Sequence, residues 1–98
     1  MTQERRNFNR TVLSTALRYQ KKGSQRFGNS ICRDISKSGI GFTSDEFFPV
    51  STSLVFELQH PQTNQFIKAA GEIVWISSQP HSERYSAGAR FFGPPVAI

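Results

Sequence analysis

Three arginines lie close together near the start of the chain, within Arg5-Arg6-Asn7-Phe8-Asn9-Arg10. Arg6 and Arg10 form an Arg-x-x-x-Arg motif, and Arg5 adds a third guanidinium beside it. A guanidinium is a planar fork of donors that binds phosphate oxygens, or the O6 and N7 acceptors of guanine, through paired hydrogen bonds. It also stacks on a base face, which an ammonium does poorly. The segment therefore suits a phosphorylated nucleotide, and a solvated basic tail is the alternative.

A second polar motif, Asp-x-Ser-x-x-Gly, consists of Asp34, Ser36 and Gly39. An Asp carboxylate only accepts hydrogen bonds, so it complements the N1–H and N2–H₂ edge of guanine, although a salt bridge or a turn cap would use it equally well. The Ser36 hydroxyl can contact a ligand or cap its own turn. Gly39 supplies either a special backbone conformation or a close approach that a Cβ would prevent.

The two motifs, in this order and each leading into a strand-like segment, resemble the signature motifs of the PilZ family of cyclic di-GMP receptors. The segments 71–75 (Gly-Glu-Ile-Val-Trp) and 88–91 (Gly-Ala-Arg-Phe) are similar to the last strands of that family. The resemblance implies that cyclic di-GMP is the ligand, without a further cofactor, and that motility, biofilm or exopolysaccharide production is controlled through a protein partner. It implies a cyclic di-GMP site made of Arg5, Arg6, Arg10, Asp34, Ser36 and Gly39.

Short strands are expected to position these motifs, because apolar residues alternate with polar ones over several short segments. In the first segment Leu13 and Leu17 are also four residues apart, so a short helix is the alternative there. In the second, Phe27, Ile31 and Ile35 are expected to share one face. The expected strands are 11–20, 26–34, 40–43, 54–58, 66–76 and 85–91.

This pattern predicts an all-β fold, a small six-stranded antiparallel β-barrel of Greek-key-like topology with a flexible N-terminal arm. The length fits a single domain over residues 1–98. We expect a flexible basic arm at 1–10, the barrel at 11–92 and a tail at 93–98, where Gly93-Pro94-Pro95 prevents regular structure. A lone Trp75 in a strand is more typical of a core than of a ligand site. Arg90 could reach the ligand or point to solvent.

The charge is concentrated in the first part of the chain. Residues 1–37 carry nine basic and two acidic side chains, and residues 38–98 carry three basic and five acidic ones, for a net charge of +5. Such a one-sided basic field attracts an anionic partner. No apolar run is long enough to cross a membrane, and the charged start MTQERRNFNR leads into no apolar run of the kind that a signal peptide has. The single cysteine fits a reducing compartment, so we expect a cytoplasmic protein without membrane insertion.

Two other classes of function fit the sequence less well. An enzyme is not expected: His60 and His81 have no spacing typical of metal ligands, and neither a phosphate-binding loop nor a nucleophile elbow is present. A barrel that binds single-stranded nucleic acid would interleave aromatic and basic residues on its sheet, whereas here the basic residues crowd the arm and the first strands. A ligand-free adaptor with the same fold is a third possibility, which the complete motifs disfavour.

Overall fold

The computed structural model describes residues 11–60 and 63–98, and within these ranges the chain forms strands and no helix. Each of the six expected strands is present, so the strand prediction for the first segment is confirmed and its helical alternative is wrong. The strands are β1 (Thr11–Lys21), β2 (Phe27–Ile35), β3 (Gly39–Ser44), β4 (Ser53–Gln59), β5 (Phe66–Ser78), β6 (Tyr85–Phe91) and β7 (Val96–Ala97).

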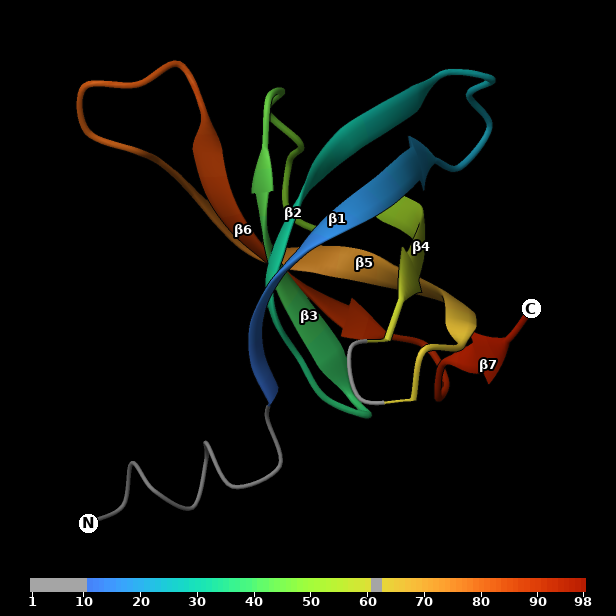
Figure 1. The fold of residues 1–98 in the computed structure, drawn as a ribbon. Coiled ribbons are helices and arrows are strands. Elements are labelled where there is room, and N and C mark those ends of the chain that lie inside the picture. Colours follow the sequence, from blue (N-terminus) through green and yellow to red (C-terminus); the bar gives the residue numbers. More distant parts are fainter. Residues whose placement is uncertain (1–10, 61–62) are drawn as a thin grey trace, which may run out of the picture.

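The first six strands close into an antiparallel barrel in the order β4-β1-β2-β3-β6-β5, with β5 pairing back onto β4 (Figure 1). Strands β1, β2 and β3 follow one another as a meander, and β4 returns to lie beside β1. This spatial order, 4-1-2-3, is the Greek key. The predicted all-β barrel is therefore confirmed. Because the sheet closes, each of the six strands pairs with a neighbouring strand on both sides.

Aromatic rings fill the interior of the barrel. Phe42 and Phe56, both completely buried, meet edge to face with centroids 5.2 Å apart. Tyr19 packs against Phe42 and also against Phe48, which comes from the link between β3 and β4. Because such pairs gain energy beyond the area they bury, they suit a domain with a modest core.

Strand β2 differs from the expected alternation. Ile35 is buried, but Phe27 and Ile31 are 49% and 39% exposed. Cys32, which lies between Ile31 and Ile35 in the sequence, points into the barrel instead. The cause is an irregularity in the pairing with β3, where the register shifts between Cys32 and Asp34. One extra residue in a strand moves the side chains beyond it to the opposite face. The prediction that Phe27, Ile31 and Ile35 share a face is therefore wrong.

The tail is also more regular than its prolines predict. Val96 and Ala97 pair with Lys68 and Ile67 of β5, and the backbone N–H of Ile98 donates to the Phe66 carbonyl at 2.9 Å. The β5 residues that pair with the tail come before those that pair with β6. Their edge opposite β4 is therefore free to pair with the tail. Pro94 and Pro95 interrupt the ladder without ending it, and the predicted lack of regular structure after Gly93 is wrong.

Cys32 lies inside the barrel directly before the second motif. Its side chain is fully buried, and burial, aided by the nearby Asp34 carboxylate, raises the pKa of the Cys32 thiol to about 12. Both causes penalise the thiolate, and therefore favour the neutral thiol. Cys32 is thus a core residue. Within the described ranges, no helix capable of crossing a membrane occurs.

Candidate functional site

The start of β1 and the turn between β2 and β3 lie at the same end of the barrel (Figure 1). Thr11, the first residue of β1, pairs with Ile35, the last residue of β2. Arg5, Arg6 and Arg10 themselves lie outside the described residues. The described part of β1 therefore begins at the barrel end where Asp34 and Ser36 lie.

Asp34 is half-buried near the end of β2, and its side chain lies over β3. Its two carboxylate oxygens are 2.8 and 3.1 Å from the position that a Cβ on Gly41 would occupy. Gly41 is the residue that pairs with Asp34 across the two strands. A side chain at position 41 would therefore collide with this carboxylate, so the glycine allows Asp34 to lie flat on the outer surface.

Ser36 uses its polar groups within the turn that it begins. Its backbone N–H donates to the Gly39 carbonyl at 2.9 Å, and its hydroxyl oxygen accepts from the Ser38 N–H at 3.2 Å. This is the turn-capping role that the residue type allows, and it fixes the hydroxyl at the tip of the motif. The hydroxyl also approaches the Ser38 hydroxyl at 3.2 Å, so the two form a small polar group at the exposed turn.

Gly39 is needed for contact with a neighbouring strand. A Cβ at this position would lie 2.6 Å from the Ala89 carbonyl oxygen of β6, which is too close for any side chain. The φ of Gly39 is not positive. Among the glycines in the described part of the chain, Gly23 is the one with a positive φ. Of the two roles expected for Gly39, the structure therefore has the close approach, made to β6, and not a special backbone conformation.

Trp75 was expected in the core but is 46% exposed on the outer face of β5. Its indole leans over Gly88 of β6, where a Cβ would clash with the ring. Gly88 pairs with Gly41, the glycine beneath Asp34. The carboxylate of Asp34 and the ring of Trp75 therefore lean from β2 and β5 over two adjacent strands whose facing residues have no side chains. A flat aromatic ligand would find a stacking surface and an acceptor here.

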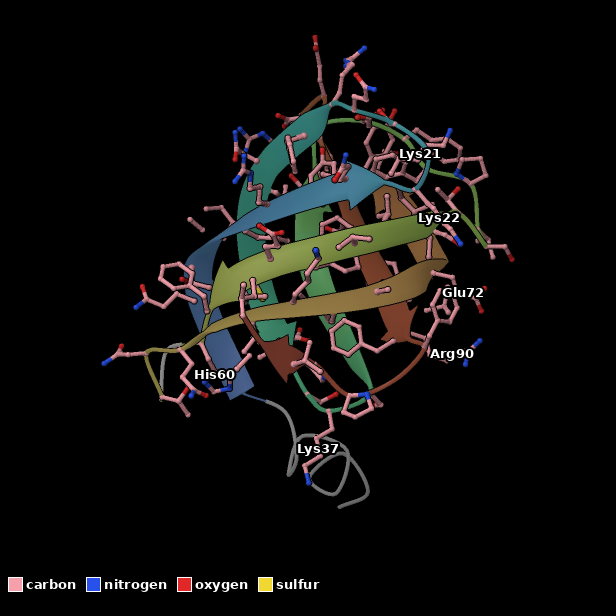
Figure 2. All side chains as sticks on the ribbon, turned by 90° about the vertical axis from the view of Figure 1, so that its right-hand side faces the viewer. Lys21, Lys22, Lys37, His60, Glu72 and Arg90 are labelled. Carbon is pink, nitrogen blue, oxygen red and sulfur yellow. The ribbon has the colours of Figure 1, made fainter. Side chains whose placement is uncertain are left out.

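An ion pair borders this surface on the side nearer the motif turn. Arg90 of β6 pairs across the strands with Gly39 on one side and Glu72 on the other. Its guanidinium donates to the Glu72 carboxylate, and Figure 2 shows the two side chains together on the outside of the barrel. Arg90 thus has a protein partner, and its side chain is at the same time more than half exposed to solvent.

The barrel end also has an open groove of about 560 Å³ next to the motif turn. Ser36 and Lys37 form one side of it, and His60, Ile67 and Pro94 are among the residues on the other sides. Its volume lies within the range of small-molecule pockets. Among residues 11–60 and 63–98, no group of three or more His, Cys, Asp or Glu side chains could hold a metal ion.

The sequence motifs therefore identified one part of this surface, and the strand pairings complete it with Trp75, Gly41 and Gly88. The available signal was the glycines: Gly41 and Gly88 interrupt strand-forming sequences, and a glycine inside a strand often marks a close approach of other groups. Their pairing with each other depends on the β3–β6 register, which the sequence does not reveal.

Comparisons with known proteins identify a family and a similar fold. A family model described as PilZ domain matches residues 4–97. No curated protein matches the sequence. Among solved structures, the fold is similar to the one titled "Structure of Bacillus subtilis Inhibitor of motility (MotI/DgrA)", with a TM-score of 0.71 and 19% sequence identity. The match covers 87% of this chain and 41% of that one, so it shows a shared fold over less than half of that protein's length.

Proposed function

Because this chain belongs to the PilZ domain family, we propose that it is a non-catalytic receptor for the second messenger cyclic di-GMP, bound on the outer face of the barrel beside the β2–β3 turn. The observation that supports the proposal is the pairing of Thr11 with Ile35, because the arginine segment directly precedes Thr11 in the sequence and Ile35 lies within the Asp-x-Ser-x-x-Gly motif. We propose that these two motifs, 24 or more residues apart in the sequence, contribute to one site.

Each side chain has a role that its chemistry allows. Arg5, Arg6 and Arg10 bind the two phosphodiesters and the O6/N7 edges of guanine, because guanidinium forks match both acceptors. Asp34 accepts from the N1–H and N2–H₂ edge of one guanine. Trp75 stacks on a base, and the glycines beneath it keep the surface flat. Ser36 and Gly39 hold the turn against β6 in the geometry described above.

The proposed output is a change of surface rather than a reaction. Ligand binding neutralises the arginine arm and orders it against the barrel, so that a downstream protein meets a different face in the bound state. The similar solved structure is that of an inhibitor of motility. For this chain we propose a ligand-gated protein interaction in the cytoplasm, where a second messenger is available to it.

A titration followed by tryptophan fluorescence tests the ligand. Trp75 is the only tryptophan in the chain, so its emission reports on this surface alone. Cyclic di-GMP is expected to quench it saturably, because a guanine stacks on the indole. Cyclic di-AMP is expected to bind far more weakly, since adenine presents a donor where guanine has O6. Calorimetry of the same mixture gives the stoichiometry.

The competing outcomes are distinct. Equal affinity for an oligothymidine strand and for cyclic di-GMP would identify a nucleic-acid-binding barrel instead, and its affinity would fall steeply with salt because a long strand releases many counterions. If neither ligand binds, the result would favour a protein-interaction adaptor with the same fold. A cyclic dinucleotide has two charges, so the proposed receptor should show only a shallow dependence on salt.

Ordering of the arm on binding is a separate prediction. Residues 5–10 contain three arginines and one large apolar residue, Phe8, so this segment has little apolar surface to offset its conformational entropy of about 1–2 kcal/mol per fixed residue. The phosphates of the ligand supply the missing interactions. NMR order parameters for residues 5–10 are expected to rise to those of the strands at saturation. Order parameters that are already high without ligand, or that stay low with it, would contradict the switch.

A further inference from the structure

A second concentration of positive charge lies on the hairpin formed by β1 and β2. Residues 15–32 contain Arg18, Lys21, Lys22 and Arg26 and no acidic residue. Elsewhere in the described chain, three cations pair with carboxylates, in Lys68–Glu57, Arg84–Asp45 and Arg90–Glu72. None of the four hairpin cations forms such a pair within the described ranges. Like charges held together without counterions destabilise a fold slightly and attract an anionic partner.

This basic hairpin, as we name residues 18–28, is distant from the motif site. In Figure 2, Lys21 and Lys22 lie at one end of the barrel and Lys37, on the motif turn, lies at the other. Strand β2 runs from Phe27 at the hairpin end to Ile35 at the motif end, a rise of about 3.3 Å per residue. The two basic regions are therefore separated by most of the barrel's length, and one small dinucleotide cannot bridge them.

The basic hairpin combines its charges with exposed apolar surface. Phe27 is 49% exposed on the flank of the hairpin, and the Arg18 guanidinium stacks on its ring at 4.1 Å from the centroid. Next to the ring is a pocket of about 120 Å³, with Lys21, Arg26 and Glu46 among its lining residues. Its volume is below the roughly 300–1,000 Å³ of small-molecule pockets and suits a single side chain. An aromatic ring and an arginine beside such a pocket are the composition of protein-binding hot spots.

The position of the apolar surface distinguishes the class of partner. The tip of the hairpin, residues 22–26, is Lys-Gly-Ser-Gln-Arg and offers no apolar side chain to insert into a bilayer. Phe27 directly follows the tip, but the Arg18 guanidinium lies against its ring, so inserting this ring into a bilayer would take a charged group out of water. Single-stranded nucleic acid prefers several successive aromatic platforms, whereas this hairpin exposes one ring, and a carboxylate, Glu46, lines the adjacent pocket.

We propose that the basic hairpin is a docking surface for an acidic protein segment, in which an apolar side chain enters the pocket beside Phe27 and flanking carboxylates pair with Lys21, Lys22 and Arg26. Charge complementarity selects the partner and accelerates its encounter. The surface lies away from the motif site, so ligand and partner can be bound at the same time. This inference concerns a different surface from the one assigned to cyclic di-GMP and does not depend on that assignment.

A synthetic peptide with one leucine between two runs of three glutamates provides the probe, labelled with fluorescein for anisotropy at low salt. Amide shifts in ¹⁵N spectra are expected to concentrate in residues 18–28. The double variant Lys21→Gln/Arg26→Gln should bind the peptide at least about tenfold more weakly, the equivalent of about 1.4 kcal/mol. Phe27→Ala, which keeps every charge, should also weaken binding, whereas a purely electrostatic attraction would leave it unchanged and overturn the apolar part of the proposal.

The matched control is Lys37→Gln/Lys68→Gln, which removes the same charge at positions outside the hairpin and should change peptide affinity less than twofold. An equal loss in this control would show attraction by net charge alone and would overturn the proposal. Tighter hairpin-dependent binding of phosphatidylserine vesicles, or of an oligothymidine strand, would overturn the class of partner. The hairpin variant should retain wild-type affinity for cyclic di-GMP, and a loss there would assign the hairpin to the ligand site. A wild-type protein that ignores cyclic di-GMP but binds the peptide contradicts only the proposed receptor function.

Discussion

Replacing Arg6 and Arg10 together by alanine is expected to weaken cyclic di-GMP binding by about 100-fold or more. Each guanidinium provides charge-assisted hydrogen bonds to a phosphate or a guanine edge, and losing one such partner costs a few kcal/mol, or roughly tenfold or more in affinity. The two effects should add approximately if the side chains contact different groups of the ligand. Calorimetric titration of both proteins measures the difference directly.

Two further variants separate the arginine fork from its charge. The Lys21→Gln/Arg26→Gln variant loses the same charge at the opposite end of the barrel, so its affinity for cyclic di-GMP should equal that of the wild type. Arg6→Lys keeps the charge but loses the planar pair of donors, and it should therefore bind measurably worse. Wild-type affinity in the Arg6/Arg10 double variant would exclude these arginines from the site.

Phe42→Ala is expected to cause a large loss of stability. The ring is completely buried and packs edge to face on Phe56 while also contacting Tyr19. Truncating a buried phenylalanine typically costs about 3–5 kcal/mol, because the removed ring leaves a cavity that the closed barrel fills poorly. Small domains are stable by only about 5–15 kcal/mol, so a large share of the total would be lost.

Urea denaturation followed by circular dichroism provides the measurement, with Phe92→Ala as the matched control. Phe92 is 58% exposed, so removing its ring should change the free energy of unfolding by about 0.5 kcal/mol or less. The denaturation midpoint of Phe42→Ala should fall well below that of both other proteins. Equal midpoints for the two alanine variants would mean that Phe42 does not lie in the core.

The sequence was sufficient to predict the strands and their assembly into a closed barrel, because alternation of apolar residues survives in most of them. In β6, for example, Ala87, Ala89 and Phe91 all point inward as their spacing predicts. Strand β2 was predicted incorrectly at its first half because an irregular pairing near Asp34 reverses the alternation, and nothing in the local sequence indicates it. The short β7 was missed for a related reason, since its pairing depends on space left beside β5 rather than on its own two residues.

The candidate site was predictable only as far as the motifs extend along the chain. Asp34, Ser36 and Gly39 were recognisable from their spacing, and the structure brings all three to one end of the barrel. Trp75 was not, because an isolated tryptophan in a strand is usually buried, and its exposure here follows from an irregularity in the β5–β6 pairing just before it. The roles of the arginines in binding remain predictions, as these residues lie outside the described part of the chain.

The buried position of Cys32 has a practical consequence for labelling. Alkylating reagents react with the thiolate, and a thiol whose pKa is raised to about 12 is almost entirely protonated at pH 7. The ring of strands around Cys32 also denies reagents a path to the sulfur in the folded protein. The folded protein should therefore behave in labelling experiments as if it had no reactive cysteine. A single replacement at an exposed position such as Ser82→Cys would provide a fluorophore attachment point, without first removing the cysteine that the core requires.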